Sequence, residues 1–173
     1  MQKLKSLRGV WQQNAVFLVT APLVVIADQL SKLWIRSSLA LGESIPETGF
    51  FRLTHIQNTG AAFGLFQDHS LALAIIAIIG SVVILFLVFF MSHRFHILNT
   101  LLGKLSLGLI LGGTVGNLID RLRYGGYVTD FIDFSFWPAF NIADSSVVVG
   151  AFLLAYSLIR LTRHSEHSDG QSV

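Results

Sequence analysis

Residues 71–91 read LALAIIAIIGSVVILFLVFFM, twenty-one positions without a formal charge. About 20 apolar residues at 1.5 Å rise per residue cross a hydrocarbon core of roughly 30 Å. This stretch therefore predicts a transmembrane helix. The whole chain agrees with it, because 53% of the residues are hydrophobic and only 13% are charged. A soluble domain carries about a quarter charged residues, so much of this protein's surface should contact lipid.

Three further spans lie on either side of this stretch, at about 14–34, 98–119 and 141–161. The sequence thus predicts a mainly α, polytopic membrane protein with four transmembrane helices, forming one membrane domain over residues 1–173. The N-terminus is basic and then apolar, as in a signal peptide, but no small-x-small cleavage site follows. We expect it to remain as an uncleaved first span.

Lysine and arginine in the short flanks predict the orientation, because they concentrate on the cytoplasmic side. The flanks before span one and between spans two and three contain basic residues and no acid, whereas 36–70 and 120–140 mix arginines with six acids. Both termini are therefore expected in the cytoplasm. The basic residues that indicate this are Lys3, Lys5, Arg8, Arg94, Lys104, Arg160 and Arg163.

The two outer connections are too long to be simple turns. The segment 51–56 has β character, and glycine and proline punctuate the rest of 36–70, which predicts a small β-structured lobe on the membrane surface. Within 120–140, residues 127–137 are rich in aromatic and β-branched types and predict an extended or interfacial piece. The polar tail 163–173 is expected to be disordered.

Several function classes are disfavoured by what the sequence lacks. There is no cysteine, which excludes disulfides and a thiol nucleophile. The net charge is only +2, without a basic patch for nucleic acid. Neither H-E-x-x-H nor G-x-S-x-G occurs. A Ser–Lys dyad is conceivable, but Ser31 and Lys32 are adjacent on a helix and point in different directions.

Polar and charged residues that cost free energy near hydrocarbon lie on separate segments, and these segments should bring them together at one membrane face. Charged groups near hydrocarbon cost several kcal/mol unless they are paired or wet, so they mark function by default. Given the predicted orientation, the outer ends of spans one, three and four, and the loop between the last two, fall at the same depth. The residues brought together are Asp28, Lys32, Asn117, Asp120, Arg121, Asp130, Asp133, Asn141 and Asp144.

Each of these residues also has a purely structural interpretation. Asp28 and Lys32 are spaced i, i+4 and could form an intrahelical ion pair. Asn141 and Asp144 have the form of a capping box. Asp120 beside Arg121 could be a surface pair, and Asp133 could be solvated. It is their convergence that favours a site.

Carboxylates are the abundant chemical groups at this face. Two carboxylates that share a site cannot both ionise easily, so one can activate water while the other, protonated, polarises a carbonyl. Asp144 and one loop acid form the natural pair. The main alternative is a small four-span transporter whose acids relay protons or bind cations, with acids spread through the membrane depth. A lipid-binding scaffold would explain the outer lobe but not the buried acids.

Five motifs carry a resemblance to a known family. They occur in the family's order over roughly residues 20 to 155, and together they resemble lipoprotein signal peptidase, the bacterial type II signal peptidase. The motifs are Ala27-Asp28-Gln29-Leu30-Ser31-Lys32, Asn58-Thr59-Gly60-Ala61-Ala62-Phe63, Gly116-Asn117-Leu118-Ile119-Asp120-Arg121, Val128-Thr129-Asp130-Phe131 and Phe140-Asn141-Ile142-Ala143-Asp144-Ser145.

The resemblance implies an aspartic endopeptidase of the bacterial cytoplasmic (inner) membrane, with its active site at the outer face. It would cleave diacylglyceryl-modified prolipoproteins before the lipid-modified cysteine, with Asp130 and Asp144 as the catalytic pair. No cofactor or metal is implied, and the expected partners are these substrates and membrane lipids, with the chain as a monomer and no nucleic acid. The residues expected to bind substrate or shape the site are Asp28, Lys32, Asn58, Gly60, Asn117, Asp120, Arg121, Asn141 and Ala143.

Physical roles follow as hypotheses. Asn141 would orient a carboxylate of the pair through its amide, and the turn from Asp28 to Lys32 would brace the loop that bears Asn58. Asn117 and Arg121 would hold Asp120 or the substrate backbone. The small residues Gly60, Ala61 and Ala62 would let a lobe lie close over the peptide. Gly125-Gly126 adds a residue to the family pattern ahead of Asp130, which a glycine pair in a turn can absorb.

Overall fold

The computed structural model describes residues 2–60, 69–92 and 94–169. Its four long helices are α1 (Gln2–Ser38), α2 (Ser70–Phe86), α3 (Leu101–Arg123) and α4 (Ile142–Asp169). A π-helical turn, Leu87–Met91, extends α2, and a 3₁₀ turn, His96–Asn99, precedes α3. Within the described residues, four segments are long and apolar enough to cross a membrane: Asn14–Ser38, Ser70–Met91, Leu101–Arg123 and Ile142–Thr162. The predicted four-span fold is confirmed.

Two predicted boundaries were wrong. The third helix continues past residue 119 to Arg123, so Asp120 and Arg121 belong to α3 and not to the following loop. The tail was expected to be disordered from residue 163, but α4 continues to Asp169, and residues 170–173 lie outside the described part. The sequence from 163 to 169 contains neither glycine nor proline, and adding a residue to an existing helix costs little.

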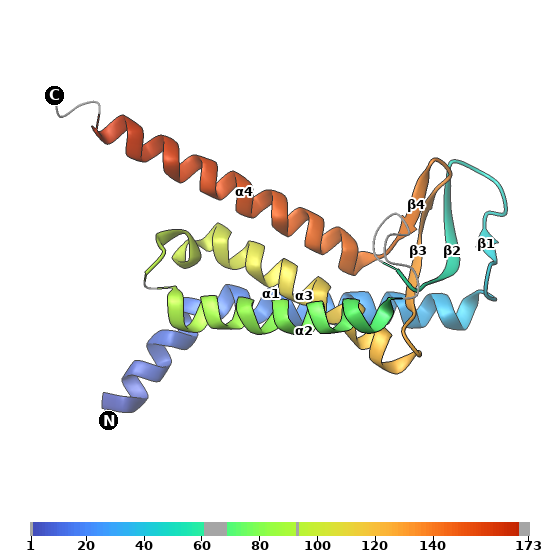
Figure 1. Ribbon diagram of the computed structural model, residues 1–173, viewed down its shortest axis with the longest axis horizontal. Coiled ribbons are helices and arrows are strands. Elements are labelled where there is room, and N and C mark those ends of the chain that lie inside the picture. Colours follow the sequence, from blue (N-terminus) through green and yellow to red (C-terminus); the bar gives the residue numbers. More distant parts are fainter. Residues whose placement is uncertain (1, 61–68, 93, 170–173) are drawn as a thin grey trace.

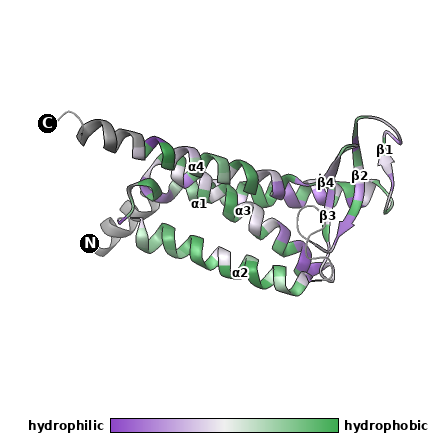
Figure 2. Ribbon diagram, turned by 45° about the horizontal axis from the view of Figure 1, so that its top comes forward, coloured by the Kyte–Doolittle hydropathy of each residue, from purple (hydrophilic) through white to green (hydrophobic). Residues whose placement is uncertain are grey.

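Helix α3 packs between α1 and α4, and its glycines permit close contact with both. A Cβ added to Gly112 would lie 2.7 Å from the carbonyl oxygen of Ala21 in α1, and one added to Gly113 would lie 2.3 Å from that of Ala143 in α4. Small residues at such crossings allow membrane helices to approach closely. The helices consist mainly of hydrophobic residues along most of their length (Figure 2), and many large hydrophobic side chains are exposed on the bundle surface. Helix α2 contributes much of this surface, since only 11% of its span is buried.

The two outer connections form one antiparallel sheet. Its strands are β1 (Ser44–Ile45), β2 (Phe51–Asn58), β3 (Val128–Phe134) and β4 (Trp137–Phe140), in the order β1-β2-β3-β4. The sequence predicted a β lobe and a separate extended piece. Pairing of β2 with β3 joins them instead, because each strand offers the other a hydrogen-bonding edge.

The sheet lies at the end of the bundle opposite to both termini (Figure 1). It rests on the end of α1, where Ile35, Leu39 and Phe131 form a buried apolar cluster. Between α3 and β3 the chain turns at Gly125 and Gly126, with φ values of 65° and 99°. This left-handed conformation favours glycine, so the glycine pair makes the turn that leads to Asp130.

Candidate active site

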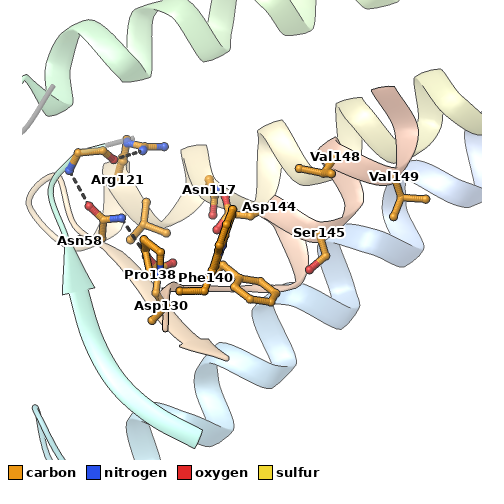
Figure 3. A pocket seen from close by; sticks show the side chains of 14 residues that line it. Asn58, Asn117, Arg121, Asp130, Pro138, Phe140, Asp144, Ser145, Val148 and Val149 are labelled. Atoms are coloured by element: carbon orange, nitrogen blue, oxygen red, sulfur yellow. Dashed lines mark hydrogen bonds between the residues drawn. The ribbon is translucent and has the colours of Figure 1, made fainter. Parts of the chain in front are cut away.

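A pocket of about 400 Å³ lies where the sheet meets α3 and α4 (Figure 3). Polar side chains line one part of it, and residues of β4 and the lipid side of α4 line the rest. Asp130 and Asp144 both face this pocket. Its complete lining is Asn58, Gly60, Asn117, Arg121, Val128, Asp130, Trp137, Pro138, Ala139, Phe140, Asp144, Ser145, Val148 and Val149.

Asp130 is buried in β3, with 2% of its surface exposed. Its Oδ2 atom accepts a hydrogen bond from Nδ2 of Asn58 at 2.9 Å, and its Oδ1 atom accepts one from Nδ2 of Asn141 at 2.7 Å. Burial raises the pKa of the Asp130 carboxyl to about 7, and the charge of Asp144 adds to the rise, while the two amide donors and Lys32 oppose it. Asp130 is thus poised to exchange a proton near neutral pH.

Asp144 lies in the first turn of α4 and accepts hydrogen bonds at both carboxylate oxygens. Nδ2 of Asn117 donates to Oδ1 at 2.7 Å, and the backbone N–H of Asn141 donates to Oδ2 at 3.2 Å. In return, Oδ1 of Asn141 accepts from the backbone N–H of Asp144 at 2.9 Å. This reciprocal pair is the predicted capping box. Asp144 therefore stabilises the start of α4 and also lines the pocket.

Beneath the pocket lies a fully buried ion network. Nζ of Lys32 lies 2.8 Å from Asp28 and 3.3 Å from Asp120, and it donates to Oδ1 of Asn117 at 2.9 Å. Asp28 also accepts from the backbone N–H of Ala143 at 3.0 Å. Buried charges are tolerated when they are paired and hydrogen-bonded. The network fixes α1, α3 and the start of α4 relative to one another directly under the two pocket acids.

Arg121 ties the far wall of the pocket to α3. Its guanidinium donates to the carbonyl oxygen of Gly60 at 3.0 Å, and the backbone N–H of Gly60 donates to Oδ1 of Asn58 at 2.9 Å. Asn58 in turn donates to Asp130. The loop after β2 is thus linked to the pocket acid through two polar side chains.

The structure corrects one hypothetical role and gives partners to two further side chains, whose expected contact with the substrate stays a prediction. Lys32 does not brace the loop that bears Asn58 but binds Asp120 and Asn117. Asn117 holds Asp144 rather than Asp120. Arg121 holds the carbonyl of Gly60.

Other predictions have simpler outcomes. The geometry does bring Asn141 onto Asp130, as the sequence suggested. Asp133 is not free in water but pairs with Arg52 at 2.5 Å on the outer part of the sheet. Ala61 and Ala62 lie outside the described residues. The hydroxyl of Ser31 donates to the carbonyl of Asp28 in its own helix, so no Ser–Lys dyad is formed. Among the residues that the structure describes, no group of three histidine, aspartate or glutamate side chains is placed to hold a metal ion.

Sequence reasoning missed several residues that contribute to the polar network and the pocket. Gln29 donates to Oδ1 of Asp120 at 3.0 Å and to the carbonyl of Gly116 at 3.1 Å. Arg36 lies 3.6 Å from Asp120. Its position four residues after Lys32 was a usable signal, because residues spaced i, i+4 share a helix face. The apolar pocket wall from Trp137 to Phe140 had a weaker signal, its place directly before span four.

Fold and pocket define a multi-pass membrane protein with two acids gathered in one pocket at the end of its helix bundle. The model of the family described as "Signal peptidase (SPase) II" matches residues 20–160. The chain belongs to the signal peptidase II family and is therefore a peptidase. The resemblance seen in its motifs is confirmed.

Individual relatives agree with this assignment. A lipoprotein signal peptidase of Dehalococcoides mccartyi is 46% identical over 92% of this chain and 96% of its own length. One of Moorella thermoacetica is 44% identical over 83% of this chain and 92% of its own. A solved structure described as a bacterial membrane enzyme superposes with a TM-score of 0.76 at 32% identity, covering 86% of this chain and 90% of that one.

Proposed function

We propose that this chain removes signal peptides from lipid-modified prolipoproteins, and that Asp130 and Asp144 are its catalytic pair. The observation that carries the proposal is the joint position of the two acids in one pocket, each held at both carboxylate oxygens by amide donors. The names of the relatives supply the substrate class. The acids supply the chemistry.

The pair would share one proton. Because burial and mutual repulsion raise the pKa of Asp130 to about 7, the singly protonated pair is accessible at neutral pH. The ionised carboxylate takes a proton from water, whose oxygen attacks the scissile carbonyl carbon. The protonated carboxyl gives its proton to the carbonyl oxygen. When the C–N bond of the resulting diol breaks, the amine leaves with the proton that came from water, and the pair regains its own as the carbonyl re-forms.

The substrate would reach the pocket from the bilayer. Val148 and Val149 line the pocket, yet 53% and 49% of their surface is exposed on the outer face of α4. In a spanning helix that face contacts lipid. A diacylglyceryl group on the cysteine after the cut could therefore remain among lipid chains while the peptide bond lies at the two acids.

We further propose that the protein resides in the bacterial cytoplasmic membrane with both termini inside and the pocket at the outer face. The basic flanks of the spans support this orientation. The arrangement also suits the reaction, because an exported precursor would present its cleavage site at the outer surface.

The test is to incubate the purified protein with a lipid-modified prolipoprotein and follow the shortened product. Asp130→Asn and Asp144→Asn retain side-chain volume but remove the ionisable group, so each should lower kcat by about 10²–10⁴-fold or more. Asp133→Asn is the matched control, because Asp133 lies on the same strand but outside the pocket. Wild-type cleavage by either pocket variant would refute the catalytic assignment.

A further inference from the structure

Thr129, the residue directly before Asp130, is held from three sides. The backbone N–H of Thr129 donates to Oδ2 of Asp120 in α3 at 3.0 Å. Its carbonyl oxygen accepts from Nδ2 of Asn141 at 3.3 Å. Its hydroxyl accepts from Nη1 of Arg36 in α1 at 2.9 Å. Pairing of β3 with β4 begins only at Ile132, so these backbone groups of Thr129 have side-chain partners in place of a strand.

Arg36 supplies the side-chain part of this hold. It lies one turn beyond Lys32 on α1, and its guanidinium contacts Oδ2 of Asp120 at 3.6 Å besides the hydroxyl of Thr129. The guanidinium also lies 4.5 Å from the ring centre of Tyr124. With only 16% of the side chain exposed, the arginine has little freedom to adopt other rotamers. Its planar donor group can serve several acceptors at once.

We propose that Arg36 and Thr129 are positioning residues for Asp130, and we name the unit Arg36–Asp120–Thr129 the β3 clamp. The proposal rests on the catalytic role proposed for Asp130. Neither Arg36 nor Thr129 lines the pocket, so both act through the backbone that carries the acid. The clamp fixes where β3 leaves the Gly125-Gly126 turn, and this sets the direction in which the Asp130 carboxyl faces Asp144.

Loss of the clamp should affect the reaction more than substrate binding. Asp130 would keep its two amide donors, but its backbone could shift relative to α3 and α4. Misplacement of a reacting group by about 1 Å can lower the rate about 10²-fold. The pocket walls that contact the substrate would remain. We therefore expect kcat to fall and KM to stay nearly constant.

The sheet itself offers a matched control. Arg52 pairs with Asp133 three residues beyond Asp130 on the same strand, and Thr54 donates to the same carboxylate oxygen at 3.3 Å. This second arginine–carboxylate–threonine unit also binds β3, but away from the pocket. A general loss of sheet stability should follow from disrupting either unit, whereas a positioning effect should follow only from disrupting the β3 clamp.

The experiment compares Arg36→Met, Arg36→Lys, Thr129→Val and Arg52→Met in the full-length protein, with kcat, KM and Tm measured for each on a lipid-modified precursor. We expect kcat to fall about tenfold in Arg36→Met and roughly fivefold in Thr129→Val, with KM within twofold of wild type. Arg36→Lys should recover most of the kcat, because a cation remains beside Asp120. Arg52→Met should lower Tm without lowering kcat.

Wild-type kcat in both Arg36→Met and Thr129→Val would overturn the proposal, as would equal losses of kcat in Arg36→Met and Arg52→Met. If Arg36→Met does not fold, Thr129→Val decides alone, since it exchanges one oxygen for a methyl group. Asp130→Asn is measured alongside. If that variant is inactive while the clamp variants are normal, only the clamp fails. If Asp130→Asn is itself active, the proposed function fails.

Discussion

Asn141 donates a hydrogen bond of 2.7 Å from its Nδ2 atom to Oδ1 of Asp130. The orientation of this amide is not free, because its Oδ1 atom accepts from the backbone N–H of Asp144 at the start of α4. Capping the helix thus forces the donor end of the side chain toward Asp130. One residue couples the helix that carries one acid to the strand that carries the other.

Asn141→Asp should separate these two roles. Asparagine and aspartate are equally good helix N-caps, so α4 should still form, but a third buried carboxylate beside Asp130 and Asp144 should lower Tm. Its second carboxylate oxygen would replace a donor with an acceptor facing Asp130, and kcat should fall on the order of 10²-fold. Thermal unfolding and steady-state cleavage measure the two effects. A variant that cleaves normally would show that the amide donor is not needed.

Activity should decline as pH rises through the pKa of Asp130, near 7. Above this value the pair loses its shared proton, and both carboxylates are ionised. The charged groups that face Asp130 are Asp144 from α4, Lys32 from α1 and Arg121 from α3. Replacing Asp144 would remove its repulsion and so lower the pKa of Asp130. The pH profile of kcat/KM measures the decline. A flat profile between pH 6 and about 8.5 would contradict the role of the raised pKa of Asp130.

The free energy of unfolding should also change with pH as Asp130 titrates. The pKa of Asp130 rises from 3.8 in the unfolded chain to about 7 in the fold, so the folded state binds more protons between these values. The contribution of Asp130 to the free energy of unfolding is therefore largest below pH 4 and is lost as pH rises to 7. Asp130→Asn should gain Tm relative to wild type as pH increases across this window.

The four spans and the common depth of the polar residues could be predicted from sequence, because hydropathy and charge report directly on the membrane environment. Which side chains contact one another could not be predicted from sequence. Lys32 was expected to reach toward Asn58, yet it binds Asn117 and Asp120. Sequence spacing fixes the face of α1 that carries Lys32 but not which helix packs on that face.

The single sheet was beyond sequence reasoning for a similar reason. Strands β2 and β3 belong to connections separated by two spans, and the pairing of Asn58 with Val128 is set by how α1 and α3 bring their ends together. The clamp on Thr129 arises only from that pairing. Asn141 was a partial exception, since its role as N-cap follows from local sequence and places it beside Asp144, while its contact with Asp130 comes from the packing of β3.

Gly113→Ala should destabilise the bundle. The added methyl carbon would lie 2.3 Å from the carbonyl oxygen of Ala143, a backbone atom that cannot move away without shifting α4. We expect Tm to fall by several degrees, as overpacking costs about 1–3 kcal/mol. Gly80→Ala is the control, because nothing lies within 4 Å of its added carbon. That substitution should leave Tm unchanged or raise it, since alanine favours helix.

The proposed orientation can be tested because the chain has no cysteine. Single variants Glu47→Cys and Val173→Cys in intact cells are treated with a thiol reagent that does not cross the cytoplasmic membrane. Glu47 is exposed between β1 and β2, so its variant should be labelled at once. Val173→Cys should react only after the membrane is permeabilised. The opposite pattern would place the pocket in the cytoplasm.

The lipid on the substrate should determine how fast the substrate is cleaved. Asp144 lies in the first turn of α4, about 5.4 Å or less from the helix start, so the scissile bond must be held at the membrane boundary. Two acyl chains would supply that positioning, since each buried methylene contributes about 0.8 kcal/mol. This binding energy, remote from the bond, would fix the geometry of the reacting groups. A precursor with an unmodified cysteine should therefore be cleaved on the order of 10²-fold more slowly in kcat/KM.

Helix α4 provides the means to locate this effect. Val148 lines the pocket, whereas Phe152, one turn farther along α4, is 72% exposed and does not. Val148→Asn places an amide where the lipid-bearing end of the substrate would enter, so it should reduce the preference for the modified precursor. Phe152→Asn should leave that preference intact. Both precursors are compared in the same detergent for each variant. Equal rates for the two precursors with wild-type protein would mean that the lipid is not recognised, and the enzyme would then be a more general peptidase of the membrane surface.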